Sequence, residues 1–318
     1  MAGSSLRAAI IDGMPATAHR RPTPGPATRQ QASANRIVTI SRALEIAGRL
    51  ANDAAEVIAA TAGRGAADPG VSPFDWVTDT DRTLERHTRR VLTGEFPGIP
   101  VLGEEYGGPD GLGPLPPALP GSADGPELLW VVDPIDGTAN YLAGLPWCSY
   151  SLALLDADGP LVGVIADPYR AQIYAAARDR GLRANGSVVP RPAGPDPGAE
   201  CDLTGRLICT ELAGGLDHDL AVVLVDSCRR ARIGLRMLGS PALAITQVAL
   251  GRAAAAVLFD YQVWDVGGAL ALAAEAGLAV VTLDGSPGTL PLGGLVVAAP
   301  GTVPAVLALV GHRPAAAP

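Results

Sequence analysis

Apolar side chains follow a helical spacing over several stretches of the chain. Residues 36–62 carry them every three to four positions, which predicts one long amphipathic helix. Residues 82–92 repeat this spacing after a Thr/Asp-rich segment that can cap a helix. By the same reasoning, four later helices are predicted over residues 217–230, 241–250, 263–276 and 303–310.

Short apolar runs between turn-forming residues predict strands. They lie at residues 99–103, 128–132, 149–155, 161–166, 172–177, 207–209, 233–238, 254–259, 278–283 and 295–298. In the second half of the chain these strands alternate with the predicted helices. Such alternation is typical of an α/β (α+β) fold built in layers.

Two polar, Gly- and Pro-rich stretches interrupt the periodic segments. Residues 107–126 are predicted to form a loop, and residues 184–203 to form the boundary between two halves. We therefore expect a disordered tail over residues 1–36, an N-terminal α+β half over 37–190 and a C-terminal α/β half over 191–318.

Charge and composition exclude several classes of protein. The net charge of −8 argues against nucleic acid as a partner, because a nucleic-acid site needs a basic face. All 24 basic residues are Arg, so neither a Schiff-base lysine nor a P-loop lysine is present. No apolar run reaches the length of about 18 residues that a membrane helix needs. We expect a cytoplasmic protein without a membrane partner.

Cysteine and histidine are too sparse to carry the chemistry. The four Cys residues (Cys148, Cys201, Cys209 and Cys228) lack CxxC spacing, so neither a disulfide scaffold nor a zinc site is expected. The four His residues form no metal-binding pair.

Residues 130–138 (Trp-Val-Val-Asp-Pro-Ile-Asp-Gly-Thr) combine a buried strand with two carboxylates. Pro134 is expected to make a turn that aims Asp133 and Asp136 at one point, and the Ile135 carbonyl could add a third oxygen. Hard cations such as Mg²⁺ prefer oxygen ligands, so this motif fits them. An ordinary Asp-Pro turn is the alternative interpretation.

The residues that follow suit a phosphate group. Gly137 lets the backbone approach a ligand closely, and Thr138 offers a hydroxyl. If a helix or turn begins here, its free amides form a cradle for phosphate.

Other carboxylates occupy the ends of predicted strands or the starts of predicted helices. Glu104 and Glu105 follow the strand at 99–103, whereas Asp81 and Asp265 sit where helices begin. Each alone is more often a cap or a surface charge. Carboxylates repel one another, so a cluster of them requires a neutralising cation.

Together these segments resemble the inositol monophosphatase family. The resemblance covers about residues 37–310 and rests on Gly103-Glu104-Glu105, Asp133-Pro134-Ile135-Asp136-Gly137-Thr138 and Trp264-Asp265-Val266. It implies a layered αβαβα sandwich, a homodimer, and two or three Mg²⁺ ions between carboxylates. It also implies a phosphoric monoester hydrolase.

The resemblance further implies a role for each matched residue. Glu104, Asp133 and the Ile135 carbonyl would hold one ion. Asp133, Asp136 and Asp265 would hold a second, and Asp81 with Glu104 a third. The residues implied for catalysis are Glu105, Thr138 and Asp81, and those implied for substrate binding are Gly137, Thr138, Gly239, Ser240 and Asp260.

The expected reaction is Mg²⁺-dependent hydrolysis of a phosphate monoester of a small metabolite by metal-activated water. The substrate stays open among inositol phosphate, another sugar or polyol phosphate, histidinol phosphate and a 3′-phosphonucleotide. Asp260 lies in a shortened segment before Trp264, which favours a specialised substrate. The alternatives are a non-catalytic relative that binds metal or phosphate, and a Ca²⁺-binding interaction module, for which the EF-hand spacing is absent.

Overall fold

The computed structural model describes residues 26–64, 67–69, 76–108, 118–195, 201–211 and 218–311. The chain forms two compact units, Met1–Val38 and Thr39–Pro318. The first helix, α1, spans Pro26–Thr61, so the prediction of a disordered tail over 1–36 is wrong for residues 26–36. Pro26 is pre-organised for the first helical position, and the residues after it are mostly good helix formers. The rest of the predicted tail lies outside the described residues.

A seven-stranded sheet occupies the first half of the larger unit. Its strand order is β3-β4-β5-β6-β7-β8-β9, with β3 parallel to β4 and the other neighbours antiparallel. The strands are β3 (Val101–Gly103), β4 (Leu129–Asp136), β5 (Ser149–Asp156), β6 (Gly159–Asp167), β7 (Gln172–Ala177), β8 (Leu182–Ala184) and β9 (Ser187–Val188). The last residue of β8 and all of β9 lie within residues 184–203, the stretch predicted to form the boundary between the two halves.

A five-stranded sheet of order β11-β10-β12-β14-β13 follows. Its strands are β10 (Leu207–Glu211), β11 (Gly234–Met237), β12 (Ala255–Leu258), β13 (Ala279–Val281) and β14 (Leu295–Ala298). The expected boundary near residue 190 therefore falls between the two sheets, although both sheets belong to one compact unit.

Seven α-helices and two small elements complete the described part of the chain. After α1 come α2 (Asp79–Glu95), α3 (Thr138–Ala143), α4 (His218–Arg230), α5 (Pro241–Ala249), α6 (Val263–Glu275) and α7 (Val303–Leu309), with a 3₁₀ turn at Pro168–Arg170. β1 (Ala67–Pro69) pairs with β2 (Trp76–Thr78) just before α2.

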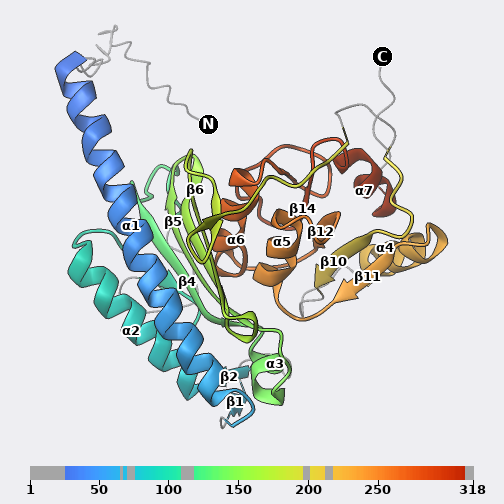
Figure 1. Ribbon diagram of the computed structural model, residues 1–318, viewed down its shortest axis with the longest axis horizontal. Helices are drawn as coiled ribbons and strands as arrows, with labels where there is room; N and C mark the ends of the chain where they lie inside the picture. The colour runs from blue at the N-terminus through green and yellow to red at the C-terminus, as the bar shows by residue number, and fades with distance from the viewer. Residues whose placement is uncertain are drawn as a thin grey trace, which may run out of the picture. The chain divides into compact units, whose positions relative to one another are not determined.

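Alternating side chains bury both faces of each sheet, which gives five layers (Figure 1). One face of the seven-stranded sheet packs on α1 and α2 through residues such as Trp130 and Leu152. Its other face, with α5 and α6, meets the five-stranded sheet in a core rich in Ala. The outer face of the second sheet is covered by α4 and α7. The predicted αβαβα sandwich is confirmed.

Glycines allow α6 to lie close against β5 and β6. A Cβ atom at Gly163 would collide with the carbonyl of Gly268, and one at Gly268 would lie 2.8 Å from Oγ of Ser151. This close packing fixes the height of α6 over the sheet. Because Asp265 lies in the first turn of α6, the same packing places its carboxylate.

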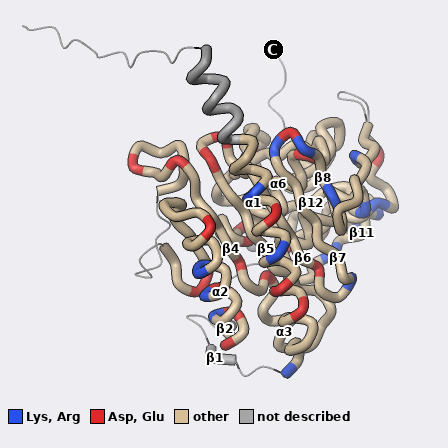
Figure 2. The backbone as a smooth tube through the Cα atoms, turned by 60° about the vertical axis from the view of Figure 1, so that its left-hand side comes forward, with Lys and Arg blue, Asp and Glu red and all other residues tan. Residues whose placement is uncertain are grey.

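Surface charge is mixed within the described residues. In Figure 2 acidic positions and arginines are interspersed along the helices and strand ends that this view shows. Cys148, Cys201, Cys209 and Cys228 are all free thiols, as the absence of paired spacing predicted. None of the described helices has the length and apolar character required to cross a bilayer.

Candidate active site

Asp133 and Asp136 lie on β4, at the end of a strand that is buried throughout. The expectation that the strand stops at residue 132 and turns at Pro134 is wrong, since β4 continues to Asp136. Its pairing with β5 shifts register between Asp133 and Asp136. Pro134 has no N–H for the ladder, so a register shift rather than a full turn accommodates it.

The carboxylate of Asp136 is held at the start of α5. Its Oδ2 accepts hydrogen bonds from the Ser240 hydroxyl, from the Ala242 amide at 3.0 Å and from the Ser149 hydroxyl at 3.1 Å. Ser240 is the N-cap of α5 and is fully buried. Ser240, expected from the resemblance to bind substrate, is thus directed at Asp136, and Gly239 precedes it with φ +82°.

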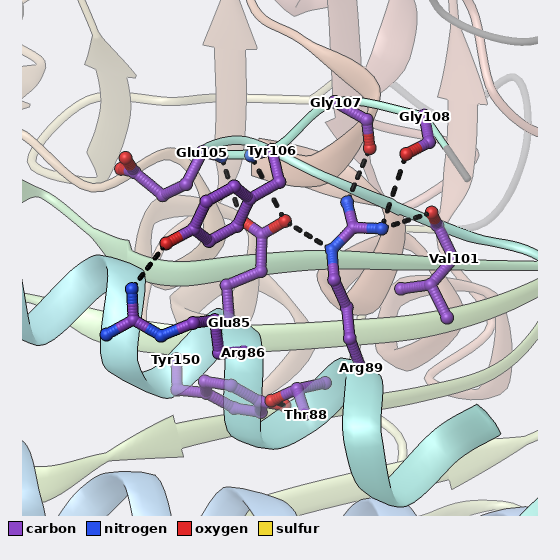
Figure 3. A network of polar contacts seen from close by, with 10 residues as sticks. All are labelled: Glu85, Arg86, Thr88, Arg89, Val101, Glu105, Tyr106, Gly107, Gly108 and Tyr150. Carbon is purple, nitrogen blue, oxygen red and sulfur yellow. Dashed lines mark hydrogen bonds and ion pairs between the residues drawn. The ribbon is translucent and has the colours of Figure 1, made fainter. Parts of the chain in front are cut away.

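The turn that carries Glu104 and Glu105 is fixed from beneath by α2 (Figure 3). The buried Glu85 carboxylate accepts the amides of Glu105 at 2.8 Å and Tyr106 at 3.3 Å. Arg89 pairs with Glu85 at 2.7 Å. A Cβ atom at Gly103 would collide with this carboxylate, which explains the glycine there.

Arg89 extends the same network to the backbone on either side of the turn. It donates to the carbonyls of Val101 at 3.0 Å and Gly107 at 2.5 Å. The Glu85–Arg89 pair therefore holds both ends of the loop that presents Glu104.

Two further carboxylates occupy equivalent places on two helices. Asp81 and Asp265 are each the third residue of their helix and complete a capping box, with Thr78 and Gln262 respectively. The Gln262 amide donates to Asp265 at 2.7 Å, and the Thr78 amide donates to Asp81 at 3.0 Å. The sequence interpretation of both as caps is confirmed.

Gly137 and Thr138 open the short helix α3. Gly137 is its N-cap with φ +92°, and the Thr138 hydroxyl donates to the Ile135 carbonyl at 2.9 Å. No side chain of the described residues caps α3, so its first amides are available to an anion. A Cβ atom on Gly137 would lie 2.7 Å from the Gly239 carbonyl, which places Gly239 beside the start of α3.

The carboxylates of these elements act on one another electrostatically. Burial, followed by the charges of Glu104, Asp136 and Asp265, raises the pKa of Asp133 well above its usual range. Burial and then the charge of Asp265 also raise the pKa of Glu104, and the charges of Glu105 and Asp81 add to this shift. The charges of the carboxylates implied as metal ligands therefore act on one another across these elements.

Burial is also the main cause of the raised pKa at Asp81 and Asp265. It raises the pKa of Asp81 to about 6 and that of Asp265 to about 7. The charge of Asp260 contributes to the shift at Asp265, so Asp260 belongs to the same electrostatic neighbourhood. A cluster of this kind is costly unless a cation neutralises it.

The donor set fits a hard divalent cation. Oδ1 of Asp81, Oε2 of Glu104 and Oδ1 of Asp133 are buried without any hydrogen-bond partner, as oxygens awaiting a cation would be. Within the described residues, however, no group of three or more His, Cys, Asp or Glu side chains could hold an ion in its present arrangement. Asp81, Asp136 and Asp265 each accept a backbone N–H at Oδ2.

Three polar residues around the site were missed by the sequence analysis. Glu85 holds the Glu104–Glu105 turn, Asn140 donates to the Leu238 and Trp147 carbonyls, and Glu211 accepts the Leu238 and Gly239 amides. Apart from the Trp147 carbonyl, their partners are backbone groups at least 20 positions away in the sequence. No local motif could have indicated them.

Sequence comparison places this chain among known phosphatases. The profile of the inositol monophosphatase family matches residues 39–312. The inositol-1-monophosphatase ImpA of Mycolicibacterium smegmatis is 32% identical over 236 residues, which cover 74% of this chain and 80% of that protein. The Nus factor SuhB of Xylella fastidiosa is 32% identical over 217 residues, with 68% and 72% covered.

Solved structures share the fold. SuhB of Mycobacterium tuberculosis superposes with a TM-score of 0.64 at 26% identity, covering 85% of this chain and 96% of that one. An IMPase/NADP phosphatase complexed with Mg²⁺ and phosphate superposes with a TM-score of 0.65 at 21% identity, covering 89% and 95%.

Proposed function

The chain belongs to the inositol monophosphatase family, and from that premise we propose that this phosphoric monoester hydrolase uses Mg²⁺ to hydrolyse the phosphate ester of a small polyol or sugar. The observation that carries the proposal is a set of carboxylates whose charges act on one another, three of which (Asp81, Glu104 and Asp133) have a buried oxygen without a hydrogen-bond partner. The set includes Asp136, which directly precedes the open start of α3. Relatives named inositol-1-monophosphatase support a polyol phosphate as the first substrate class to test.

The proposed metal ligands are those implied by the sequence motifs. Glu104, Asp133 and the Ile135 carbonyl would hold one ion, and Asp133, Asp136 and Asp265 a second. Asp81 and Glu104 would support a third. Bound Mg²⁺ supplies Lewis-acid stabilisation of phosphoryl charge and lowers the pKa of water.

The chain's own groups bind and orient the substrate. The first amides of α3, after Gly137, would donate to phosphate oxygens, because a helix start favours an anion. The Thr138 hydroxyl, already fixed on the Ile135 carbonyl, would help Glu105 orient the attacking water. Asp260, half-buried near Asp265, would contact hydroxyls of the alcohol part.

The reaction needs no covalent intermediate on the protein. Burial raises the pKa of the Cys148 thiol to about 12, which removes it as a nucleophile. Direct attack by water is the proposed route, and the carboxylates would hold the cations that lower the pKa of that water.

The test is release of inorganic phosphate from a panel of phosphate monoesters, with and without Mg²⁺ and with a Li⁺ titration. The panel contains inositol 1-phosphate, other polyol and sugar phosphates, histidinol phosphate and a 3′-phosphonucleotide. Mg²⁺-dependent release from a polyol or sugar phosphate is the expected result. Release from none of them, with Mg²⁺ still bound, would instead support a non-catalytic binding protein.

A further inference from the structure

Glu211 is a buried carboxylate whose partners are backbone amides. It ends β10 and is only 7% exposed. Its two oxygens accept hydrogen bonds from the Leu238 amide at 3.2 Å and the Gly239 amide at 2.6 Å. Among the described residues, no Arg or His forms an ion pair with it. Its hydrogen bonds therefore tie the carboxylate to the turn at 238–240.

That turn leads directly into the group that holds Asp136. Ser240 ends the turn and caps α5, and its hydroxyl donates to Asp136. The Ala242 amide, in the first turn of α5, donates to the same oxygen at 3.0 Å. A displacement of residues 238–240 would move both donors, so the position of Asp136 depends on the turn.

The opposite side of the turn is tied to the start of α3. Asn140 Nδ2 donates to the Leu238 carbonyl at 2.5 Å and to the Trp147 carbonyl at 2.8 Å. A Cβ atom on Gly239 would lie 2.8 Å from this Nδ2, so the contact is tight. The same turn thus touches α3, whose open amides are the proposed phosphate site.

We propose that Glu211 is a positioning residue for phosphate monoester hydrolysis. Through the amides of Leu238 and Gly239 it fixes the turn that sets both Asp136 and the Gly137 end of α3. The inference rests on the proposed function, and it assigns a role outside the metal-binding motifs. Groups that orient metal ligands typically change metal affinity or activity by about 10- to 100-fold when they are replaced.

Glu275 provides a matched control. It is the last residue of α6, and its carboxylate also accepts two backbone amides, Asp179 at 2.9 Å and Gly181 at 2.6 Å. It lies at the opposite end of α6 from Asp265. Glu275→Gln removes the same kind of interaction without touching the turn at 238–240.

The experiment compares Glu211→Gln, Glu211→Asp and Glu275→Gln by steady-state kinetics, Mg²⁺ calorimetry and thermal unfolding. We expect Glu211→Gln to lower kcat by about 10- to 100-fold and to weaken Mg²⁺ binding. Glu211→Asp keeps the charge, so an intermediate loss is expected. Glu275→Gln should keep kcat and Mg²⁺ affinity, even where its melting temperature falls.

The opposite results separate this role from a merely structural one. The proposal is overturned if Glu211→Gln and Glu275→Gln lower the melting temperature alike while both keep the wild-type kcat and Mg²⁺ affinity. If Glu211→Gln does not fold, the kcat and Mg²⁺ affinity of Glu211→Asp decide instead. If the wild-type protein hydrolyses nothing, the proposed function fails, and the Mg²⁺ affinity of the variants then tests the positioning role alone.

Discussion

Glu85 on α2 and Glu105 after β3 are joined by a hydrogen bond of 2.8 Å from the Glu105 amide to the Glu85 carboxylate. Twenty residues separate them in the sequence. This contact fixes the turn from which Glu104 reaches the other carboxylates, and Arg89 completes it at 2.7 Å from Glu85. The site therefore depends on a buried ion pair that has no part in the chemistry.

Replacing Glu85 with Ala should destabilise the protein and lower its activity. The Glu85 side chain is fully buried and that of Arg89 is 18% exposed, so the change leaves a largely buried Arg89 charge without its carboxylate partner and two amides without an acceptor. We expect a loss of about 3 kcal/mol in the free energy of unfolding, measured in urea.

The exposed pair between Arg42 and Glu95 offers the comparison. Arg42→Ala should change the free energy of unfolding far less, because exposed ion pairs contribute little. Equal losses for Arg42→Ala and Glu85→Ala would contradict the importance of the buried network.

Gly137→Ala should damage both folding and turnover. Gly137 has φ +92°, and an added Cβ atom would press against the Gly239 carbonyl. Gly186 has a similar φ of +81° with open space around it. We expect Gly186→Ala to lose about 1 kcal/mol of stability and to keep activity, whereas Gly137→Ala loses more stability and most of its kcat. Equal activity in the two variants would show that the Gly137–Gly239 contact is unimportant.

The metal-free protein should become less stable as pH rises. Burial raises the pKa of Asp81 to about 6 and of Glu211 to about 7, above the values that these groups have in the unfolded chain. The folded state then binds more protons, so this stabilising contribution is present at low pH. It is lost between about pH 4 and pH 7.

Thermal unfolding in a chelator across this pH range measures the effect. Added Mg²⁺ should raise the melting temperature most at the upper end of the range, where the carboxylates are ionised. Glu211→Gln should flatten the pH dependence, since it removes one of the titrating groups. A melting temperature that rises with pH in the chelator and does not respond to Mg²⁺ would contradict the charge cluster.

Local pattern was enough to predict much of this fold and some of the site. The cap positions of Asp81 and Asp265 follow from the predicted helix starts. The alternation of strands and helices along the chain predicted a layered α/β fold. The register shift at Pro134 could not be predicted, because it depends on how β5 pairs with β4. Glu85 and Glu211 bind backbone amides 20 and 27 residues away, so only the folded chain places them at the site.

Mg²⁺-dependent phosphate release by Asp136→Asn, compared with Asp226→Asn, tests directly whether the carboxylate cluster is the active site. Asp136 lies in the carboxylate cluster, whereas Asp226 pairs with Arg229 at 3.0 Å on the surface of α4. We expect Asp136→Asn to keep the fold, by circular dichroism, but to lose more than about 100-fold in kcat. Asp226→Asn should keep wild-type turnover. A folded Asp136→Asn variant with the wild-type rate and Mg²⁺ dependence would contradict the assignment of this cluster as the active site.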